Sequence, residues 1–499
     1  MRNDPRPFLL GTVLVATLGC DTETLVEGWQ FWDEGPALRG PGYPGTAFAE
    51  DELWVACGAV TGGPADPLHH NLQVPYRGHL LLPWSPELGT GGLSVIDMAD
   101  PCNPVAIGVT ESDAIRETHA IGSVYLPPDD PHAGDWAFTN GKEYGSFLSG
   151  ILVWNLDDPT APVASTLVTI PAALYPDSYT RVVLSLFLQY PWMYVASADN
   201  GVYVFDITDP TAPVLVNQMG FGLRAGGVFA LGNELLVSSA EQTSAALLDI
   251  SDPADPVLMP GSPFSTPGRA GLGVETYHGN RVGDLALFAR KEGGGGPIVM
   301  SLADPEAPAF VADVEHAGNG GYVFYDEGYL FVGESDHGSV WDASDPAALA
   351  LVGTGDLAGD LDTNVPWGNV MLLSVDEPET EVATAVVPWR AEPDRDGPIL
   401  LAHDPDDGTS GWLTSARVGL SFNEFIEPAS AWPGSVRLLD GEGNPVEGWV
   451  STQETTVSYV PKAPLQAGVT YTVEVDGIQD IHGNAMDGTS SFQFTTGGG

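Results

Sequence analysis

The sequence predicts an all-β protein in which a seven-bladed β-propeller is followed by a smaller β-sandwich. Glycine and proline make up 61 and 42 of the 499 residues, which is unfavourable for long helices and typical of many short strands joined by turns. A strand that ends in an acidic turn recurs six times between residues 93 and 346, whereas the last hundred residues contain alternating strands without that turn. The change of pattern predicts two all-β domains.

The composition restricts the class of partner. The chain has 67 acidic and 17 basic residues, a formal net charge of −50, and 43% hydrophobic residues. Seventeen basic side chains can neutralise few phosphate groups. A nucleic-acid partner is therefore excluded. The apolar content is enough for a buried core, so the acidic residues belong to a solvated surface.

Residues 1–20 have the pattern of an export signal. Two arginines precede an apolar run, Phe8 to Leu18, which is followed by Gly19 and Cys20. The run is far shorter than the ~20 residues that span a bilayer. The sequence ending at Cys20 resembles a lipoprotein cleavage box, which implies that Cys20 becomes the lipidated first residue; ordinary secretion after Gly19 is the alternative. We therefore expect an exported protein of the cell envelope, anchored in the outer membrane or at the cell surface, with a tether over residues 21–46.

The cysteine count agrees with export. Three cysteines are present, and lipidation of Cys20 would leave Cys57 and Cys102 to form a disulfide in an oxidising compartment. Closing a loop of about 45 residues would stabilise the fold by roughly 4 kcal/mol in the chain-entropy model. Two unpaired core thiols are the alternative.

Six copies of an apolar strand with an Asp-Pro turn indicate a repeat architecture. The prolines recur every 41 to 58 residues and on average every 49 residues. Strand-bearing repeats of nearly 50 residues indicate a propeller or a related array. The six turns are Asp100-Pro101, Asp158-Pro159, Asp209-Pro210, Asp252-Pro253, Asp304-Pro305 and Asp345-Pro346.

Each repeat is predicted to supply four strands. The aspartate can accept hydrogen bonds from the amides just ahead, and proline sets φ near −65°. A second proline three residues later opens the next strand in most copies, and this strand must lie at a sheet edge because proline cannot donate. Hairpins such as Val228–Val237 precede most of these strands. Four antiparallel strands in about 49 residues make one propeller blade.

Residues 47–390 have room for seven such units. A degenerate seventh unit, over Asn369–Ser374 and Ala383–Val387, lacks the Asp-Pro turn. The segment Phe48–Cys57 is predicted to form a hairpin whose strands close the ring against the last blade, which removes open edges. Six or eight blades would also satisfy the spacing.

These segments resemble the LVIVD repeat, and the resemblance covers roughly residues 74 to 350. It implies an extracellular β-propeller in a surface or secreted protein of bacteria or archaea, with no shared activity or catalytic set. The second and fifth copies have Asn155 and Ser301 where the others have Asp, and the sixth copy lacks the second proline. We expect those blades to be looser.

A polar linker at 391–397 precedes a predicted sandwich over residues 398–496. Four segments in this region resemble the SbsA-type bacterial Ig-like domain: Phe422–Pro428, Pro461–Tyr471, Asp480–Asn484 and Phe492–Thr496. The resemblance implies a spacer or adhesion module without catalysis. The expected strands are Val418–Phe422, Ser435–Leu439, Thr456–Val460, Tyr471–Val475 and Ser491–Thr495.

The sequence offers two kinds of candidate ligand site: the acids of the repeat turns and one long loop. Paired acids at the repeat turns offer oxygens of the kind that calcium prefers, although turn capping explains them without a metal. Loops on rigid scaffolds carry function, so the long loop in the second unit is the best candidate for a ligand contact; a solvated acidic insertion is the alternative. The candidate ligand residues are Asp129, Asp130, His132 and Asp135.

Two further sets of residues carry chemistry of other kinds. The neighbours His69 and His70 are zinc-type ligands, but no recognised zinc framework accompanies them. Glu117 and His119 would make an acid–base pair if the ring of blades brought a third group near. No metal-ligand set is assigned, and no cofactor is expected.

We expect a non-catalytic recognition or adhesion protein, with the propeller as binding platform and the Ig-like domain as spacer. The partner would be an unknown protein or glycan at the cell surface, and the membrane would be contacted through the lipid anchor only. A secreted hydrolase or lyase that uses the central funnel is one alternative, and a structural envelope component is another. Buried titratable groups that converge at the channel mouth would favour the enzyme, and a funnel of small apolar residues would favour binding.

Overall fold

The computed structural model describes residues 35–498 apart from 87–88, 147 and 175–182. Within these residues the chain is built of β-strands, with one 3-10 turn of helix, η1 (Pro428–Ser430). The predicted export signal, the anchor residue Cys20 and the tether up to residue 34 lie outside the described residues. Lipidation therefore stays a prediction.

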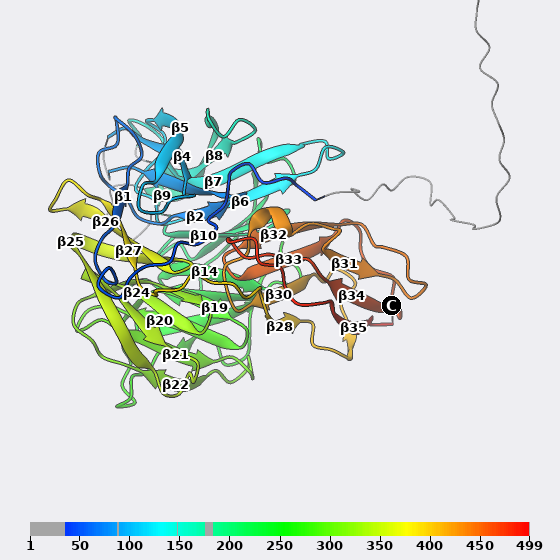
Figure 1. The fold of residues 1–499 in the computed structure, drawn as a ribbon. Helices are drawn as coiled ribbons and strands as arrows, with labels where there is room; N and C mark the ends of the chain where they lie inside the picture. Colours follow the sequence, from blue (N-terminus) through cyan, green and yellow to red (C-terminus); the bar gives the residue numbers. More distant parts are fainter. Residues whose placement is uncertain (1–34, 87–88, 147, 175–182, 499) are drawn as a thin grey trace, which may run out of the picture. The chain divides into compact units, whose positions relative to one another are not determined.

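Five antiparallel sheets follow one another along residues 74–313, and each uses consecutive strands (Figure 1). The first contains β2 (Val74–Tyr76), β3 (His79–Trp84), β4 (Gly91–Asp97) and β5 (Val105–Ser112). The second contains β6 (Ile121–Leu126), β7 (Gly134–Lys142), β8 (Leu148–Asn155) and β9 (Val163–Leu174). The third contains β10 (Ser185–Gln189), β11 (Trp192–Ala196), β12 (Val202–Asp206) and β13 (Val214–Met219). The fourth contains β14 (Ala225–Leu231), β15 (Glu234–Ser239), β16 (Ser244–Asp249) and β17 (Val257–Leu258), and the short strand β18 (Phe264–Ser265) also pairs with β16. The fifth contains β19 (Thr276–Val282), β20 (Leu285–Arg290), β21 (Pro297–Ser301) and β22 (Ala309–Asp313).

The next sheet has six strands and contains two blade-sized groups. Its strands are β23 (Gly320–Asp326), β24 (Tyr329–Asp342), β25 (Ala350–Trp367), β26 (Val370–Pro378), β27 (Thr384–Pro388) and β1 (Gly58–Val60). The first part of β24 pairs with β23 and its second part pairs with the start of β25, whereas the end of β25 pairs with β26. Ala343 N–H donates to Gly328 O at 2.8 Å, so the two ends of β24 lie against each other. Counted by register, the described strands form seven groups.

The N-terminal strand β1 completes the last group. Gly58 to Val60 pair with Val386 to Thr384 of β27, so the first and last parts of the chain share a sheet. The first strands of successive sheets also contact one another in order from β2 to β23. Gln73 donates to Ser374 Oγ at 2.7 Å, which links the segment before β2 to the last group. These contacts close the array and cover its edges.

The hairpin predicted over Phe48–Cys57 is not formed. Residues 50–54 form turns, and the strand is only the three residues of β1. The segment bonds to the last sheet instead of to itself, because Trp54 N–H donates to Pro388 O at 2.7 Å and Cys57 N–H donates to Val386 O at 2.9 Å. The prediction that early strands meet the last blade is correct, and the prediction of two strands there is wrong.

The Asp-Pro turns are held by the same two hydrogen bonds in all six copies. The aspartate carbonyl accepts from the amide three residues on at 2.9–3.0 Å. Its carboxylate accepts from the amide two residues on at 2.9–3.2 Å. A local acceptor in front of proline is the turn chemistry expected of these residues.

The acid three residues earlier caps the turn as well. Asp97, Asp206, Asp249 and Asp342 each accept from the amide two residues on at 2.8–2.9 Å. In the other two copies Asn155 Oδ1 and Ser301 Oγ accept from the equivalent amide at 3.1 and 3.3 Å. The second and fifth turns, which were expected to be looser, therefore keep the same hydrogen bond as the other copies.

The core lies between the faces of neighbouring sheets. The rings of Phe187 on β10 and Phe229 on β14 are 4.8 Å apart, and both are buried. One apolar cluster contains Leu82 and Leu93 of the first sheet together with Leu372 and Val386 of the last group. Apolar strands that face another sheet on each side explain why most of the strands are buried throughout.

The C-terminal region is a sandwich of two four-stranded sheets. One contains β28 (Leu400–Asp404), β30 (Val418–Phe422), β33 (Thr456–Pro461) and β32 (Gly448–Gln453). The other contains β29 (Thr409–Trp412), β35 (Ser490–Thr496), β34 (Thr470–Val475) and β31 (Val436–Leu439). The five strands expected from the sequence are present. The sequence missed β28, β29 and β32.

The sandwich bonds to the turns that join the first two strands of six groups. These tight turns present amides that need acceptors. The bonds are Gly78 N to Glu427 Oε2 at 3.0 Å, Trp449 Nε1 to Asp130 Oδ2 at 3.3 Å, Tyr190 N to Ser451 Oγ at 3.2 Å, Asn233 N to Asp404 Oδ2 at 2.6 Å, Gly283 N to Ser421 Oγ at 2.7 Å and Glu327 N to Asn423 O at 2.6 Å. At the seventh turn Tyr43 is the bridge, because its hydroxyl donates to Asn369 and its carbonyl accepts from His482.

This arrangement gives the propeller two different ends. The turns between first and second strands meet the sandwich, and antiparallel pairing places the start of each first strand and the end of each second strand at the opposite end. Arg417 of the sandwich is buried and donates to Gln189 at 2.7 Å and to Tyr194 at 2.8 Å. A side chain with functional access to the propeller is therefore to be sought at the end away from the sandwich.

Candidate functional site

A group of buried polar side chains meets at that opposite end, and we call it the central cluster. It consists of His69, Glu117, His119, Tyr322 and Asp376. His69 precedes β2, Glu117 and His119 precede β6, Tyr322 lies in β23 and Asp376 lies in β26. Residues 119 and 322 come from the second and sixth groups of strands, so their contact crosses the middle of the ring.

Glu117 is the hub of the central cluster. One carboxylate oxygen lies 3.2 Å from His119 Nε2 and 3.9 Å from His69 Nε2. The other lies 3.2 Å from Arg116 Nη2. Glu117 is 0% exposed, and a buried carboxylate of this kind is tolerated when it is paired.

His119 is oriented by contacts on its other nitrogen. Tyr322 Oη lies 3.1 Å from His119 Nδ1, and Asn71 Nδ2 lies 3.3 Å from the same atom. An amide donor at Nδ1 assigns the proton of the neutral ring to Nε2, where it faces Glu117. His278 stacks on Tyr322 with ring centroids 3.9 Å apart, which fixes the phenol in place.

The two carboxyl groups of the cluster are held in opposite states. Burial works to raise the pKa of Glu117, but His119 and hydrogen bonds from His119 and His69 hold that pKa well below its usual value. Burial, and then the charges of Asp362 and Glu117, raise the pKa of Asp376 to about 10. Glu117 is therefore ionised at neutral pH while Asp376 keeps its proton.

More acidic groups surround the cluster. Asp360 and Glu377 are exposed in β25 and β26. Lys291 Nζ lies 3.7 Å from Asp362 Oδ1 and 4.7 Å from the centre of the Tyr277 ring. This rim favours the approach of cations and disfavours anions.

His69, Glu117 and Asp376 also have atoms that a metal ion could use. One donor atom from each lies within 4.8 Å of the others, and all three residues are buried. Arg116 and His119 already balance the charge of Glu117. In the described residues, His69 Nε2, Glu117 Oε1 and Asp376 Oδ1 are nevertheless buried without a hydrogen-bond partner, so these ion pairs account for the charge of Glu117 but not for every donor atom of the group.

The adjacent histidines of the zinc hypothesis point to different partners. His70 Nε2 lies 2.8 Å from Asp66 Oδ2, and His70 Nδ1 lies 2.8 Å from Thr384 Oγ1. His70 is thereby a structural link to β27, and only His69 faces the central cluster. The pair does not chelate one ion.

The structure separates the four residues of the predicted ligand loop. Asp135 is buried and paired with Arg77 at 2.8 Å and with Arg39 at 2.9 Å. Asp130 accepts from His132 N and from Trp449, and His132 Nδ1 lies 3.4 Å from Asp209 Oδ1. Asp129 is exposed in the same turn. The loop lies at the sandwich end, and these contacts tie three of its residues to neighbouring elements.

The turn aspartates have amide partners rather than one another. In the described residues, the groups of three or more possible metal ligands include none of the Asp-Pro aspartates. Each of these carboxylates accepts the local amide bonds described above, so turn capping explains the acids that suggested calcium.

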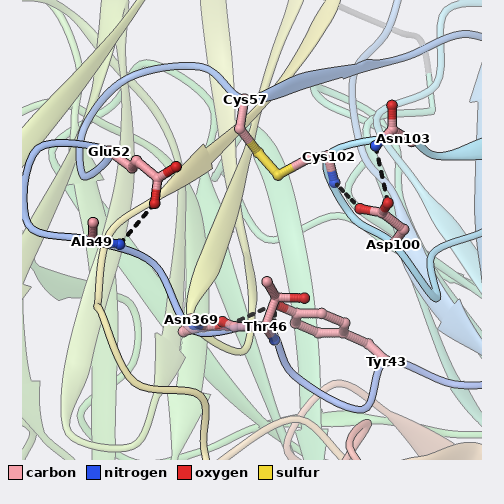
Figure 2. Close-up of a disulfide and its surroundings, with 9 residues drawn as sticks. All are labelled: Tyr43, Thr46, Ala49, Glu52, Cys57, Asp100, Cys102, Asn103 and Asn369. Atoms are coloured by element: carbon pink, nitrogen blue, oxygen red, sulfur yellow. Dashed lines mark hydrogen bonds between the residues drawn. A yellow bond between two sulfur atoms is a disulfide. The ribbon is translucent and has the colours of Figure 1, made fainter.

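A disulfide joins Cys57 and Cys102 with Cα atoms 5.0 Å apart (Figure 2). Cys57 immediately precedes β1, and Cys102 lies in the first Asp-Pro turn, where its amide donates to Asp100. The bond therefore links the closing strand to the first sheet.

The sequence missed two members of the central cluster. Asp376 lies in the degenerate seventh unit, and Tyr322 lies in an ordinary alternating strand, so neither has a local motif. Glu117 and His119 were recognised as a pair that needed a third group, and the structure brings Asp376, His69 and Tyr322 to them. The one signal in the sequence that could have found them is their position within a repeat unit. All five residues of the central cluster lie near the start of a first strand or the end of a second strand.

Comparison with protein families finds two matches. A model of the LVIVD repeat matches residues 191–219, and a model of a bacterial Ig-like domain matches residues 394–496. The second match covers the sandwich, and the first covers β11 to β13 with the Asp209-Pro210 turn. No curated protein matches the chain.

The solved structures that match this chain share little sequence with it. A putative 6-phosphogluconolactonase from Bacteroides fragilis is 12% identical with a TM-score of 0.44, and the match covers 66% of this chain and 98% of that protein. The computationally designed Ika8 protein is 10% identical with a TM-score of 0.43, and the match covers 68% and 99%. CopC from Methylosinus trichosporium is 20% identical with a TM-score of 0.18, and the match covers 20% and 93%. These values are too low to transfer an activity.

The two matched families occur in the same kind of protein. LVIVD repeats and bacterial Ig-like domains are typical of extracellular surface proteins of bacteria. In the described residues, no helix has the length and apolar character needed to cross a membrane. The chain is thus an all-β protein in which a propeller-like array, with one segment that matches the LVIVD repeat, is joined to a C-terminal bacterial Ig-like domain.

Proposed function

We propose that the protein is an exported enzyme of the hydrolase or lyase class that uses the central cluster for acid–base chemistry. The observation that carries the proposal is the convergence of Glu117 and Asp376, two buried carboxyl groups with oxygen atoms within 4.8 Å of each other; their surroundings lower the pKa of Glu117 and raise that of Asp376. Pairs of titratable groups whose pKa values are driven apart are the usual basis of acid–base catalysis. Buried titratable groups that converge at one end of the ring are the feature that favours an enzyme over a simple binding platform.

The residues have distinct roles in this proposal. Asp376 is the proton donor, because its raised pKa keeps it protonated and it adjoins the exposed residues Asp360 and Glu377. Glu117 is the ionised partner, which accepts the proton of the attacking water or of the substrate carbon while Asp376 gives its own proton to the leaving group. His119 and Arg116 are positioning residues that hold Glu117 ionised. The acidic rim selects neutral or cationic substrates over anionic ones.

A panel of lactones, esters and polysaccharides tests the activity. We expect turnover of one class by the purified protein, with a loss of at least a hundredfold in kcat for Asp376→Asn and Glu117→Gln. Asp129→Asn, an exposed acid at the sandwich end, is the matched control and should keep full activity. The rate should fall only at high pH, where Asp376 ionises. Turnover that survives both cluster variants, or no turnover across the panel, would contradict the proposal.

Recognition of a glycan is the second candidate, and a separate pocket favours it. Tyr125, Trp432 and Trp449 line a pocket between the β6–β7 turn and the sandwich, with Lys462 beside them. The Lys462 ammonium lies 5.4 Å from the centre of the Trp449 ring. Aromatic faces of this kind stack on sugar rings. Capture on a glycan array that is lost in Trp449→Ala and kept in Asp376→Asn would establish this function instead.

A further inference from the structure

A second group of polar side chains lies in the sixth group of strands. It consists of His316, just before β23, together with Glu334 and His337 from the two parts of β24. Ser335 between them has a φ of 68°, in the left-handed region, and there β24 reverses direction. Like the central cluster, this group lies at the end away from the sandwich, because it adjoins the start of a first strand and the end of a second.

Three atoms of the group form a nearly equilateral triangle. His316 Nδ1 and Glu334 Oε2 are 3.1 Å apart, and His337 Nε2 and Glu334 Oε2 are 3.2 Å apart. The two imidazole nitrogens are 3.4 Å apart. Tetrahedral ligands at about 2.0–2.1 Å from a zinc ion are about 3.3–3.4 Å from one another. The side chains thus already have the spacing of ligands around one ion.

We infer that His316, Glu334 and His337 form a binding site for a single divalent transition-metal ion of the zinc type. Two imidazoles and one carboxylate suit zinc and its neighbours in the first transition row, whereas calcium and magnesium take oxygen ligands. His316 is 24% and His337 11% exposed at the side chain, so solvent reaches the site and a fourth position is open.

Hydrogen bonding alone does not satisfy the triangle. If only one of the two imidazole nitrogens carries a proton, that proton can lie between its own nitrogen and the other two atoms. The unprotonated nitrogen and Glu334 Oε2 then have lone pairs that face each other. Protons on both nitrogens satisfy Glu334 but oppose each other across 3.4 Å. A cation at the centre makes all three contacts attractive at once.

The surroundings have the features of a metal site. His337 Nδ1 lies 2.9 Å from Asp336 Oδ1, and an outer carboxylate on the second nitrogen is the usual means of orienting a ligating histidine. Glu334 is 0% exposed, and in the described part of the chain its ion pairs are with the two histidines. Its Oε1 is buried without a hydrogen-bond partner.

The backbone holds the first ligand in place before any ion binds. His316 N–H donates to Gly295 O and Gly295 N–H donates to His316 O, both at 3.0 Å. A Cβ on residue 295 would lie 2.6 Å from Glu334 Oε1, so the glycine leaves room for the carboxylate. The edge of Trp341 meets the His316 ring with centroids 5.3 Å apart.

Cobalt and zinc titration of the metal-stripped full chain tests the site. We expect one equivalent of Co²⁺ to give the visible absorption of a low-symmetry four- or five-coordinate complex, and Zn²⁺ to displace it. His316→Ala and His337→Ala should abolish the absorption. Asp336→Asn keeps all three ligands and should weaken binding about tenfold or more.

The matched control is His69→Ala, which removes a possible ligand from the central cluster and should leave Co²⁺ binding unchanged. Loss of binding in His69→Ala with retention in His337→Ala would assign the ion to the central cluster and overturn the inference. Absence of Co²⁺ and Zn²⁺ binding by the wild-type chain would also overturn it. The inference does not depend on the acid–base proposal, since its readout is a metal spectrum and not turnover.

Discussion

At the scale of single residues, the repeat is defined by acceptors for particular amides. The six Asp-Pro turns use one aspartate carboxylate for the amide two residues on. Where the earlier acid is replaced, Asn155 and Ser301 provide an oxygen at the same place. The conserved feature is therefore an acceptor and not a charge.

Asp209→Ala should lower the free energy of unfolding by about 1 kcal/mol, because the amide and hydroxyl of Thr211 lose their acceptor. Asp209→Asn keeps the acceptor and should cost much less. Chemical denaturation of both variants measures the difference. Equal losses in the two variants would show that charge, and not hydrogen bonding, holds the turn.

At the scale of elements, the decisive strand is the shortest one in the last sheet. β1 has three residues and pairs with β27, where it is the outer strand of the seventh group. So short a strand contributes few ladder bonds, and the disulfide next to it attaches it to the first Asp-Pro turn (Figure 2). The covalent bond and the strand together keep the array closed.

Removal of the disulfide by Cys57→Ser with Cys102→Ser should destabilise the protein by up to about 4 kcal/mol, the chain-entropy value for a loop of this length. The loss should appear as a lower thermal midpoint and as earlier proteolysis near residue 58. Cys20→Ser is the control and should leave the midpoint unchanged. Wild-type stability in the double variant would show that β1 closes the array unaided.

At the scale of the whole molecule, the sandwich is packed against the propeller. It supplies acceptors to the first turns of several groups of strands, through Glu427, Asp404, Ser421 and Ser451 among others. The resemblance implied a spacer or adhesion module that follows a polar linker. Here the turn amides of the propeller and the polar edge of the sandwich satisfy one another.

Deletion of residues 391–499 tests this difference. We expect the shortened propeller to unfold at a lower temperature and to self-associate, because the turn amides and the apolar surface beside Trp449 lose their cover. Size-exclusion chromatography and thermal unfolding measure both effects. A deletion variant as stable and as monomeric as the full chain would restore the role of spacer.

The junction also predicts a dependence of stability on pH. Burial raises the pKa of Asp404, Glu427 and Glu454 to about 7 in each case. In the unfolded chain these groups ionise near pH 4, so between pH 4 and 7 the folded protein holds more protons. Stability is therefore greatest at the acidic side of this range and falls as the pH rises to about 7.

Denaturation at pH 5, 6, 7 and 8 should show the free energy of unfolding falling by several kcal/mol between pH 5 and 7. The slope should become shallower above pH 7, where Asp404, Glu427 and Glu454 are ionised, while Asp376 and Glu424, whose pKa values are higher, continue to contribute. The triple variant Asp404→Asn, Glu427→Gln and Glu454→Gln keeps the acceptors but has no proton to lose at these positions. It should make the slope below pH 7 as shallow as the slope above it. A wild-type stability that rises from pH 5 to 7 would contradict the protonated state of these groups.

The site was only partly accessible from the sequence. Glu117 and His119 are two residues apart, so their pairing could be expected, whereas Asp376 and Tyr322 are more than 200 residues away from them. His69 was considered beside His70, yet the two rings point to different partners. The loop of Asp129, Asp130, His132 and Asp135 was a candidate ligand site because its acidic and imidazole groups lie in a long loop on a rigid scaffold. Their partners, including Arg77 and Trp449, come from other elements.

Strand alternation, the Asp-Pro turns and their spacing were enough to establish the all-β class, the repeated four-stranded unit and the C-terminal sandwich, because each depends on residues close together in the chain. Closure by β1, docking of the sandwich onto the turns, and the meeting of Glu117 with Asp376 and of His316 with His337 depended on the folded arrangement. Those contacts join residues whose separation along the chain is bridged only when the sheets pack around a common centre, and no local pattern encodes which side chains then face each other.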